Sequence, residues 1–294
     1  QKARENLEEI WGYSSFRSGQ EEVIQSVLDG RDTVVLFPTG GGKSLCYQVP
    51  ATVVDGLTVV ISPLIALMQD QVDALNDIGI AATSLNSTIS GREIEQRLVN
   101  ARNGMYDLLY CSPERLKTDI WQNELKTMNV KLVAVDEAHC ISQWGHDFRP
   151  SYRDINETFE PVNDQITWIA LTATATPEVR EDIITNLELS EPHVVSNGYE
   201  RPNLKWWVTK TQNKRQKLLQ IVNRAEGTGL IYAGTRKGCE RLADALNKEG
   251  FKALAYHAGF SSGEREKIQK KWLNAEVPIV VATNAFGMGI DKAD

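Results

Sequence analysis

The glycine-rich segment at residues 38–44, Pro-Thr-Gly-Gly-Gly-Lys-Ser, has the composition of a phosphate-binding loop. Its glycines let consecutive backbone N–H groups turn inward around phosphate oxygens, at a helix N-terminus whose dipole favours negative charge. Lys43 would reach the β- and γ-phosphates of a nucleoside triphosphate, and Ser44 would ligate Mg²⁺. Phe37 stands where the strict pattern has its first glycine. The predicted phosphate contacts are Thr39, Gly40, Gly41, Gly42, Lys43 and Ser44.

Two adjacent acids follow the apolar run at residues 132–135 and begin an Asp-Glu-Ala-His string. Parallel α/β sheets present ligand-binding groups where strands end, so this position suits a carboxylate pair. Asp136 would hold Mg²⁺, and Glu137 would orient and deprotonate an attacking water. His139 would couple the site to its neighbours. Taken alone, so short a string also fits a solvated helix start. The predicted catalytic residues are Lys43, Asp136, Glu137 and His139.

A series of longer strings occurs in order along the chain: PTGGGKS, ISPLIALMQDQ, LNST, DEAHCISQWGHDFRP, ALTATAT, YHAG and VVATNAFGMGID. Together they resemble the superfamily 2 motor motifs in the form found in RecQ-type DNA helicases, over nearly the whole chain. The resemblance implies an ATP-dependent motor that uses Mg²⁺ and moves 3′ to 5′ on single-stranded DNA to unwind duplex junctions. It also implies that ATP binds between two lobes and closes them.

The same resemblance assigns a nucleotide-base site upstream of the glycine-rich loop. In the similar family segment an aromatic ring and an arginine sandwich adenine while a glutamine bonds its edge, which implies these roles for Tyr13, Arg17 and Gln20. An amphipathic segment with ordinary packing aromatics is the alternative. From the second lobe, Gly289 and Asp291 would contact the nucleotide, with Asp291 at the ribose hydroxyls.

The loop after the Asp-Glu-Ala-His string is rich in aromatic residues and punctuated by glycine and proline. Exposed aromatic rings on such a loop can stack single-stranded bases. The loop resembles the aromatic-rich loop that couples DNA binding to ATP hydrolysis in RecQ-type enzymes. Core packing is the alternative for the two large aromatics, because such residues are usually buried. The predicted DNA contacts here are Trp144, His146, Phe148 and Arg149.

Further DNA contacts are implied only by the resemblance. In the first lobe they are Pro63, Leu64, Asn86 and Ser87, and in the second lobe Arg236, His257 and Thr283. Thr172 and Thr174 would sense the nucleotide state and link the lobes. Helix capping is an alternative for the serine, threonine and asparagine residues, and ordinary surface polarity is one for the second-lobe positions.

Short β-branched runs alternate with longer helical patterns from about residue 31, which predicts parallel α/β sheets. We expect strands at 33–37, 58–62, 81–85, 108–111, 132–135 and 167–171, then at 229–233, 253–256 and 279–282. Turn-forming residues cluster at 197–203. The predicted fold is α/β, with two RecA-like parallel-sheet domains in tandem: lobe 1 at 1–200 and a C-terminally truncated lobe 2 at 201–294.

The net charge of −7 counts against a general polyanion binder, so any nucleic-acid contact should be a local groove. The four cysteines show no C-x-x-C spacing, which argues against a zinc site or a disulfide framework and favours a reducing, intracellular compartment: cytoplasm and nucleoid, or nucleus. No apolar run approaches the roughly 20 residues that span a bilayer, and no signal peptide is visible.

The sequence ends shortly after the GMGID string. The resemblance implies that an arginine-bearing element reaching the γ-phosphate would follow it, so we expect this chain to bind nucleotide with impaired catalysis. Two other functions remain open: an RNA helicase of the same superfamily, and a non-catalytic, nucleotide-gated DNA-binding module.

Overall fold

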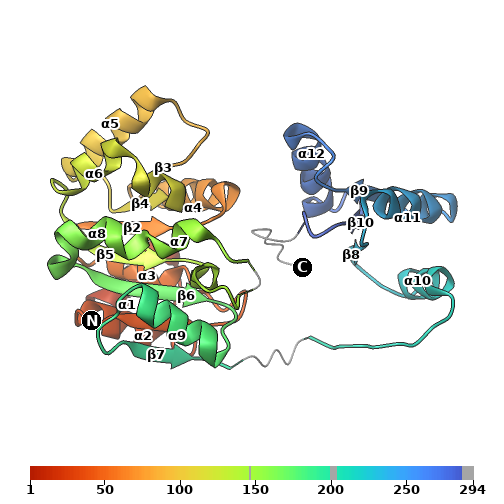
Figure 1. The fold of residues 1–294 in the computed structure, drawn as a ribbon. Coiled ribbons are helices and arrows are strands. Elements are labelled where there is room, and N and C mark those ends of the chain that lie inside the picture. Colours follow the sequence, from red (N-terminus) through yellow and green to blue (C-terminus); the bar gives the residue numbers. More distant parts are fainter. Residues whose placement is uncertain (146, 199–203, 287–294) are drawn as a thin grey trace. The chain divides into compact units, whose positions relative to one another are not determined.

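The computed structural model describes residues 1–145, 147–198 and 204–286. The chain forms two compact units, Gln1–Arg201 and Pro202–Asp294. Each unit has a parallel sheet of its own, with helices against it (Figure 1). Within the described ranges, no helix combines the length and apolarity needed to cross a membrane.

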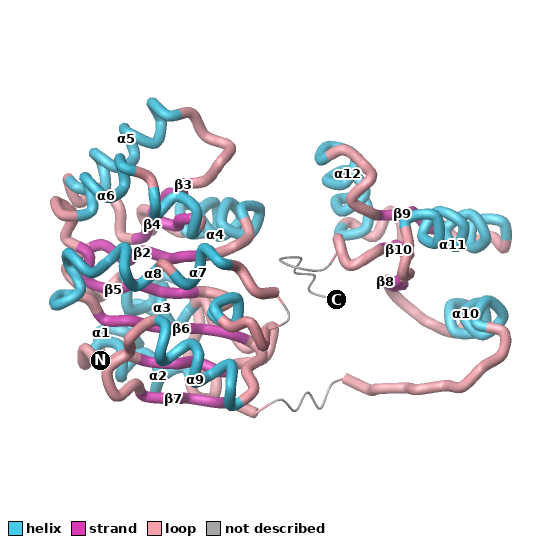
Figure 2. Tube along the Cα trace, in the orientation of Figure 1, coloured by secondary structure: helices cyan, strands magenta, loops and turns pink. Residues whose placement is uncertain are grey.

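The first unit is built on seven parallel strands in the order β3-β4-β2-β5-β6-β1-β7 (Figure 2). All strands but the edge strand β7 are almost fully buried, because helices cover both faces of the sheet. Most of these strands are rich in valine, isoleucine and leucine, whereas the other edge strand, β3, is Ala-Thr-Ser-Leu. The strands are β1 Thr33–Leu36, β2 Leu57–Ile61, β3 Ala82–Leu85, β4 Leu108–Cys111, β5 Val130–Val135, β6 Thr167–Thr172 and β7 His193–Ser196.

Successive strand residues point to opposite faces of this sheet, so the first unit has a separate core on each face. Val34 belongs to the core cluster that includes residues of α5, α6, α7, α8 and α9, whereas Val35 belongs to the cluster that includes residues of α2, α3 and α4. The α-helices are α1 Lys2–Trp11, α2 Gln20–Leu28, α3 Leu45–Ala51, α4 Ile65–Asp77, α5 Gly91–Arg102, α6 Asp119–Leu125, α7 Pro150–Arg153, α8 Ile155–Phe159 and α9 Pro177–Asn186. Short 3₁₀ helices are η1 Pro113–Lys117, η2 Ala138–Ile141 and η3 Glu160–Gln165.

The second unit has a three-stranded parallel sheet in the order β8-β10-β9. One core is formed by one face of α11 packed on the sheet, with Cys239, Ala243 and Leu246 buried. A second core includes Trp272 of α12 with Val280 of β10 and Phe286. The elements are α10 Lys214–Val222, β8 Gly229–Tyr232, α11 Arg236–Lys248, β9 Ala253–Tyr256, α12 Ser262–Leu273 and β10 Ile279–Ala282.

The predicted α/β class with parallel sheets in both halves is confirmed. Each strand expected from the alternation is present, and among the described residues β7 is the one strand that the expectation lacked. That strand carries only two valines between His193 and Ser196, and only Val195 is buried. Its apolar signal is therefore too short to separate it from a loop.

Candidate nucleotide site and nucleic-acid face

The glycine-rich loop joins the carboxyl end of β1 to α3, as the sequence predicts for a phosphate-binding loop. Gly40 and Gly42 have φ angles of 75° and 76°, a left-handed conformation that favours glycine. A β-carbon on Gly41 would lie 2.8 Å from the Pro38 carbonyl oxygen, so this position also demands glycine. The Lys43 ammonium donates to the Phe37 carbonyl at 3.3 Å. The chain therefore folds tightly here, with the lysine held against its own loop.

The segment before α2 is hydrogen-bonded directly to this loop. The buried Gln20 side chain accepts from the Arg17 backbone N–H at 2.8 Å and donates to the Gly42 carbonyl at 2.9 Å. The Arg17 guanidinium donates to the Gly40 carbonyl at 2.7 Å. Arg17 and Gln20, both predicted to bind adenine, are thus also hydrogen-bonded to the predicted phosphate loop.

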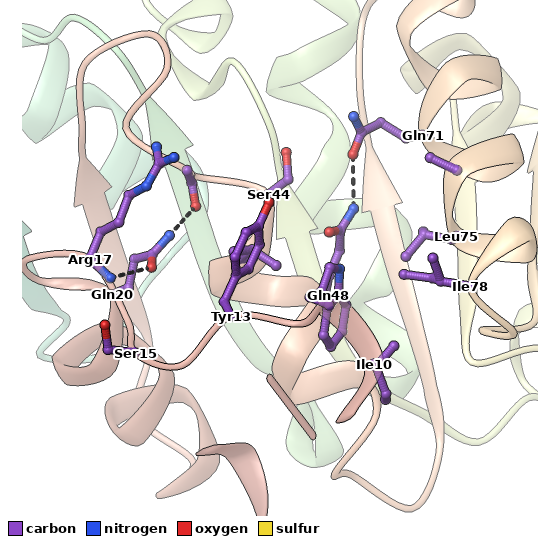
Figure 3. A pocket seen from close by; sticks show the side chains of 14 residues that line it. Ile10, Tyr13, Ser15, Arg17, Gln20, Ser44, Gln48, Gln71, Leu75 and Ile78 are labelled. Carbon is purple, nitrogen blue, oxygen red and sulfur yellow. Dashed lines mark hydrogen bonds between the residues drawn. The ribbon is translucent and has the colours of Figure 1, made fainter. Parts of the chain in front are cut away.

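A cavity of about 520 Å³ opens beside these contacts (Figure 3). The Tyr13 ring projects into it with 52% of the residue exposed, and Arg17 stands on the other side of Gln20. An aromatic face and a guanidinium with an amide between them suit a purine base. The lining residues are Ile10, Trp11, Tyr13, Ser15, Arg17, Gln20, Gly42, Ser44, Leu45, Gln48, Gln71, Ala74, Leu75 and Ile78.

The carboxylate pair lies where β5 ends, in the same sheet as β1. The Asp136 backbone N–H donates to the Ile61 carbonyl of β2 at 2.9 Å, and one Asp136 carboxylate oxygen accepts from the Glu137 N–H at 3.0 Å. Burial, and then repulsion from the Glu137 carboxylate, raises the pKa of Asp136 to about 7. The nearby Lys43 charge acts in the opposite direction. A cation bound beside Asp136 would stabilise its charged form and so offset the cost of burying the carboxylate.

His139 joins the carboxylate pair to β6. Its Nδ1 lies 2.9 Å from the Thr172 hydroxyl and 3.3 Å from a Glu137 carboxylate oxygen. The Thr172 hydroxyl donates to the Thr174 carbonyl and accepts from the Thr174 N–H. A hydroxyl has one hydrogen, so with that hydrogen on the Thr174 carbonyl the histidine Nδ1 is the donor. Both predicted coupling threonines are thus in one hydrogen-bonded chain with His139, whose Nδ1 also lies close to the Glu137 carboxylate.

The aromatic loop after η2 leaves Trp144 78% exposed, which is unusual for a tryptophan. Phe148 is half-buried, with the Arg153 guanidinium carbon 5.2 Å from its ring centre. Arg149 donates to the Pro63 carbonyl at 3.2 Å and pairs with Asp147 at 3.1 Å. The loop is therefore tied to the segment that follows β2. His146, also a predicted DNA contact, lies outside the described residues.

The other predicted first-unit contacts also follow strand ends. Leu64 is half-buried like Pro63 and directly precedes α4. The Asn86 side chain is 1% exposed and accepts from the Thr88 N–H and hydroxyl, so its amide already serves the local turn. Ser87 beside it is exposed. Of this pair, only the serine side chain faces solvent.

In the second unit the three predicted contacts follow the carboxyl ends of three parallel strands. Arg236 is exposed at the start of α11, after β8. His257, after β9, is 4% exposed, lies 3.2 Å from Glu240 and stacks on Phe260 at 4.1 Å. Thr283, after β10, is half-buried. Gly289 and Asp291 lie outside the described residues.

Several polar contacts at this edge have no motif signal. Gln48 of α3 donates to Gln71 of α4 at 2.8 Å and to the Tyr110 hydroxyl at 3.2 Å, along the wall of the cavity. The buried Tyr152 hydroxyl donates to the Asp136 carbonyl at 3.0 Å. Ser142 donates to Asp182 of α9 at 2.6 Å. The residues in each contact are far apart in the sequence, so spacing could not reveal them. In three of these contacts one partner, Gln71, Asp136 or Ser142, does lie in a conspicuous string.

Residues 17–183 match the DEAD/DEAH box helicase family, and residues 213–294 match the helicase conserved C-terminal domain. The chain belongs to the DEAD/DEAH box helicase family. The ATP-dependent DNA helicase RecQ of Bacillus subtilis (strain 168) is 47% identical over 295 residues, which cover 100% of this chain and 50% of that protein. The RecQ of Pasteurella multocida (strain Pm70) is 44% identical over 100% of this chain and 46% of its own length. The predicted resemblance to RecQ-type enzymes is confirmed, and the chain spans about half the length of these curated relatives.

Solved helicase structures share the fold at much lower identity. The helicase MrfA bound to DNA matches with a TM-score of 0.76 at 18% identity, over 99% of this chain and 43% of that one. The Hef helicase domain of Pyrococcus furiosus matches with a TM-score of 0.63 at 15% identity, over 95% of this chain and 88% of that one. These likenesses support the RecA-like class of fold that the strings predicted.

Proposed function

We propose that this chain is the motor region of an ATP-dependent DNA helicase that moves 3′ to 5′ along one DNA strand. The observation that carries the proposal is the meeting of a glycine-rich Lys-Ser loop, after β1, and an Asp-Glu pair, after β5, at the carboxyl edge of one parallel sheet. Ligands of open α/β sheets bind at that edge. The similarity to RecQ proteins over the full chain supports DNA as the track.

In this proposal ATP binds against the first unit. The base stacks between Tyr13 and Arg17, where the cavity opens, and the Gln20 amide reads its edge. Backbone N–H groups of the loop and the Lys43 ammonium hold the phosphates, because glycine lets the backbone approach them closely. Glu137 orients and deprotonates the attacking water. The contact of His139 with Thr172 transmits the change in nucleotide state from this site to β6.

The donor set at this edge fits Mg²⁺. Asp136 and Ser44 offer hard oxygen ligands, and no group of three or more metal-binding side chains occurs among the described residues. Mg²⁺ in nucleotide sites is commonly held by one or two protein oxygens plus phosphates and water. When bound, the ion would neutralise charge on the β- and γ-phosphates.

The DNA side of the proposal rests on exposed aromatic and strand-end groups. Trp144 would stack on a base, while Arg149, Pro63 and Ser87 would follow the backbone on the first unit. Arg236, His257 and Thr283 would do so on the second unit. Duplex junctions and single strands are the proposed substrates.

The test is ATP hydrolysis by this protein with and without nucleic acid. We expect slow Mg²⁺-dependent hydrolysis, in keeping with the expected impairment of catalysis, that single-stranded DNA stimulates more than RNA of the same sequence. Preference for RNA would replace the DNA helicase with an RNA helicase of the same family.

The matched variant Glu137→Gln keeps the size of the side chain and one acceptor oxygen but cannot act as a general base. It should bind a fluorescent ADP normally and lose about 10²- to 10⁴-fold in turnover, the usual contribution of a general base. Unchanged nucleotide-dependent DNA binding together with no turnover even in the parent protein would instead identify a nucleotide-gated binding module.

A further inference from the structure

We propose that Asp182 on α9 is a positioning residue for the aromatic loop, acting through Ser142 on the backbone of Trp144. This inference rests on the proposed function, because it concerns how that loop would present Trp144 to DNA. The Ser142 hydroxyl lies 2.6 Å from an Asp182 carboxylate oxygen. The same hydroxyl lies 3.1 Å from the Trp144 backbone nitrogen.

The direction of both hydrogen bonds follows from the chemistry of the groups. An ionised carboxylate only accepts and a backbone N–H only donates, while a serine hydroxyl has one hydrogen and two lone pairs. Ser142 must therefore give its hydrogen to Asp182 and accept from the Trp144 N–H. Asp182 fixes the rotation of that hydroxyl, which in turn aims a lone pair at Trp144.

Trp144 depends on this backbone contact because its side chain has little packing of its own. The residue is 78% exposed, whereas Ser142 is fully buried. The turn continues with a hydrogen bond from the Gly145 N–H to the Ser142 carbonyl at 3.0 Å. A β-carbon on Gly145 would lie 2.5 Å from the His139 carbonyl oxygen, so the turn presses on the Asp-Glu-Ala-His segment.

Asp182 also joins the aromatic loop to the helix that follows the coupling threonines in the chain. Helix α9 follows the strand that ends at Thr172 and is capped by Thr176, whose side chain accepts from the Val179 N–H. The His139 contact with Thr172 is the first link between these regions, and the contact of Ser142 with Asp182 is the second. A shift of α9 would therefore move the turn that holds Trp144.

The first experiment measures the loop itself and needs no DNA. Hydrogen exchange at the Trp144 amide should accelerate in Asp182→Leu and in Ser142→Ala, and the double variant should exchange no faster than either single one. Asp182→Asn should keep much of the protection, because its amide oxygen still accepts from Ser142. Glu181→Leu, on the exposed neighbour, is the matched control.

The second experiment measures single-stranded DNA binding by fluorescence anisotropy. Asp182→Leu should weaken binding about 5-fold or more, the equivalent of impairing one stacked base. It should have no further effect in a Trp144→Ala background. Binding of fluorescent ADP should stay within about twofold of the parent.

Two outcomes would overturn the inference: unchanged amide exchange in Asp182→Leu, or an equal loss of DNA affinity with and without Trp144. The second outcome would reduce Asp182 to a general structural role. If the parent protein binds no single-stranded DNA while the exchange results hold, the proposed DNA function fails and the positioning of the loop stands.

Discussion

Glu137 has a φ angle of 49°, a left-handed conformation that its β-carbon disfavours. The strained residue separates β5 from η2 at the point where the chain turns out of the sheet. Non-glycine residues in this conformation persist where surrounding contacts enforce them, and they concentrate at functional sites. Here the contacts of Asp136 with the Glu137 N–H and of His139 with its carboxylate hold the turn.

The half-buried Asp136 carboxylate should make the unliganded protein less stable at high pH. Its pKa is about 7 in the folded chain against an ordinary 3.8, so the charged form is favoured in the unfolded chain. The penalty is absent below pH 4, grows between pH 4 and 7, and is complete above pH 7. Asp136→Asn keeps the acceptor for the Glu137 N–H but removes the charge.

We therefore expect Asp136→Asn to raise the free energy of unfolding by roughly 1–3 kcal/mol at pH 8, less than the full shift because the side chain is partly exposed. The gain should shrink towards zero near pH 4. Urea melts in EDTA without nucleotide measure it. A gain that is equal at pH 4.5 and pH 8 would show that repacking, and not charge, is responsible.

At the scale of elements, hydrogen bonds of Arg17 and Gln20 hold the loop after β1 against the segment before α2. A β-carbon on Gly42 would lie 2.4 Å from the Gln20 side-chain nitrogen, and its φ angle is 76°. Gly12, which ends α1 with a φ of 72°, has no atom within 4 Å of such a β-carbon. The two glycines differ in their surroundings but have nearly the same φ angle.

Gly42→Ala and Gly12→Ala should both lose about 1 kcal/mol of stability from the left-handed backbone. Only Gly42→Ala should also displace Gln20 from the Gly42 carbonyl and weaken nucleotide binding, which we expect to be about tenfold or more. Calorimetric titration with ADP and thermal melts separate the two effects. Equal nucleotide affinity in both variants would mean that the contact of Gln20 with Gly42 does not shape the site.

The sequence predicts those elements well where a buried apolar run is bounded by turn formers. The strands at 108–111, 253–256 and 279–282 have the predicted bounds for this reason. The strand at 193–196 could not be predicted, because edge pairing and not apolar content makes it a strand.

The candidate site divides in the same way. The glycine-rich loop and the carboxylate pair follow from local chemistry, and both lie at strand ends as expected. The contacts of Gln20 with Gly42 and of Ser142 with Asp182 could not be predicted from spacing. They depend on which strands and helices are neighbours in space, a property of topology. The roles given to His146, Gly289 and Asp291 stay predictions.

For the whole chain, 32 lysines and arginines are outnumbered by 39 acids, and the resulting net charge of −7 counts against broad electrostatic attraction to nucleic acid. Among the predicted DNA contacts that the structure describes, only Arg149 and Arg236 carry a full positive charge, and Arg149 is paired with Asp147. Two phosphate contacts on a single strand correspond to a slope of about 0.7 × 2 = 1.4 for log Kd against log salt concentration. Stacking should supply the rest of the affinity.

We expect single-stranded DNA binding to follow a salt slope of no more than about 1.4, measured by anisotropy between low and moderate salt. Arg236→Gln should lower that slope by about 0.7, whereas Trp144→Ala should weaken binding at every salt concentration without changing it. A slope several times larger would point to a basic surface beyond these residues.

The place of β1 in the sheet has a consequence for how the protein is made. This strand is synthesised before the other six, yet its two partners are β6 and β7, with Thr33 aligned to Ile169 and to His193. A growing chain on the ribosome therefore holds the glycine-rich loop without the strands that fix its base until the first unit is almost complete. Nascent chains should therefore gain ATP affinity late and in one step. Nucleotide binding would then report that the first unit has finished folding.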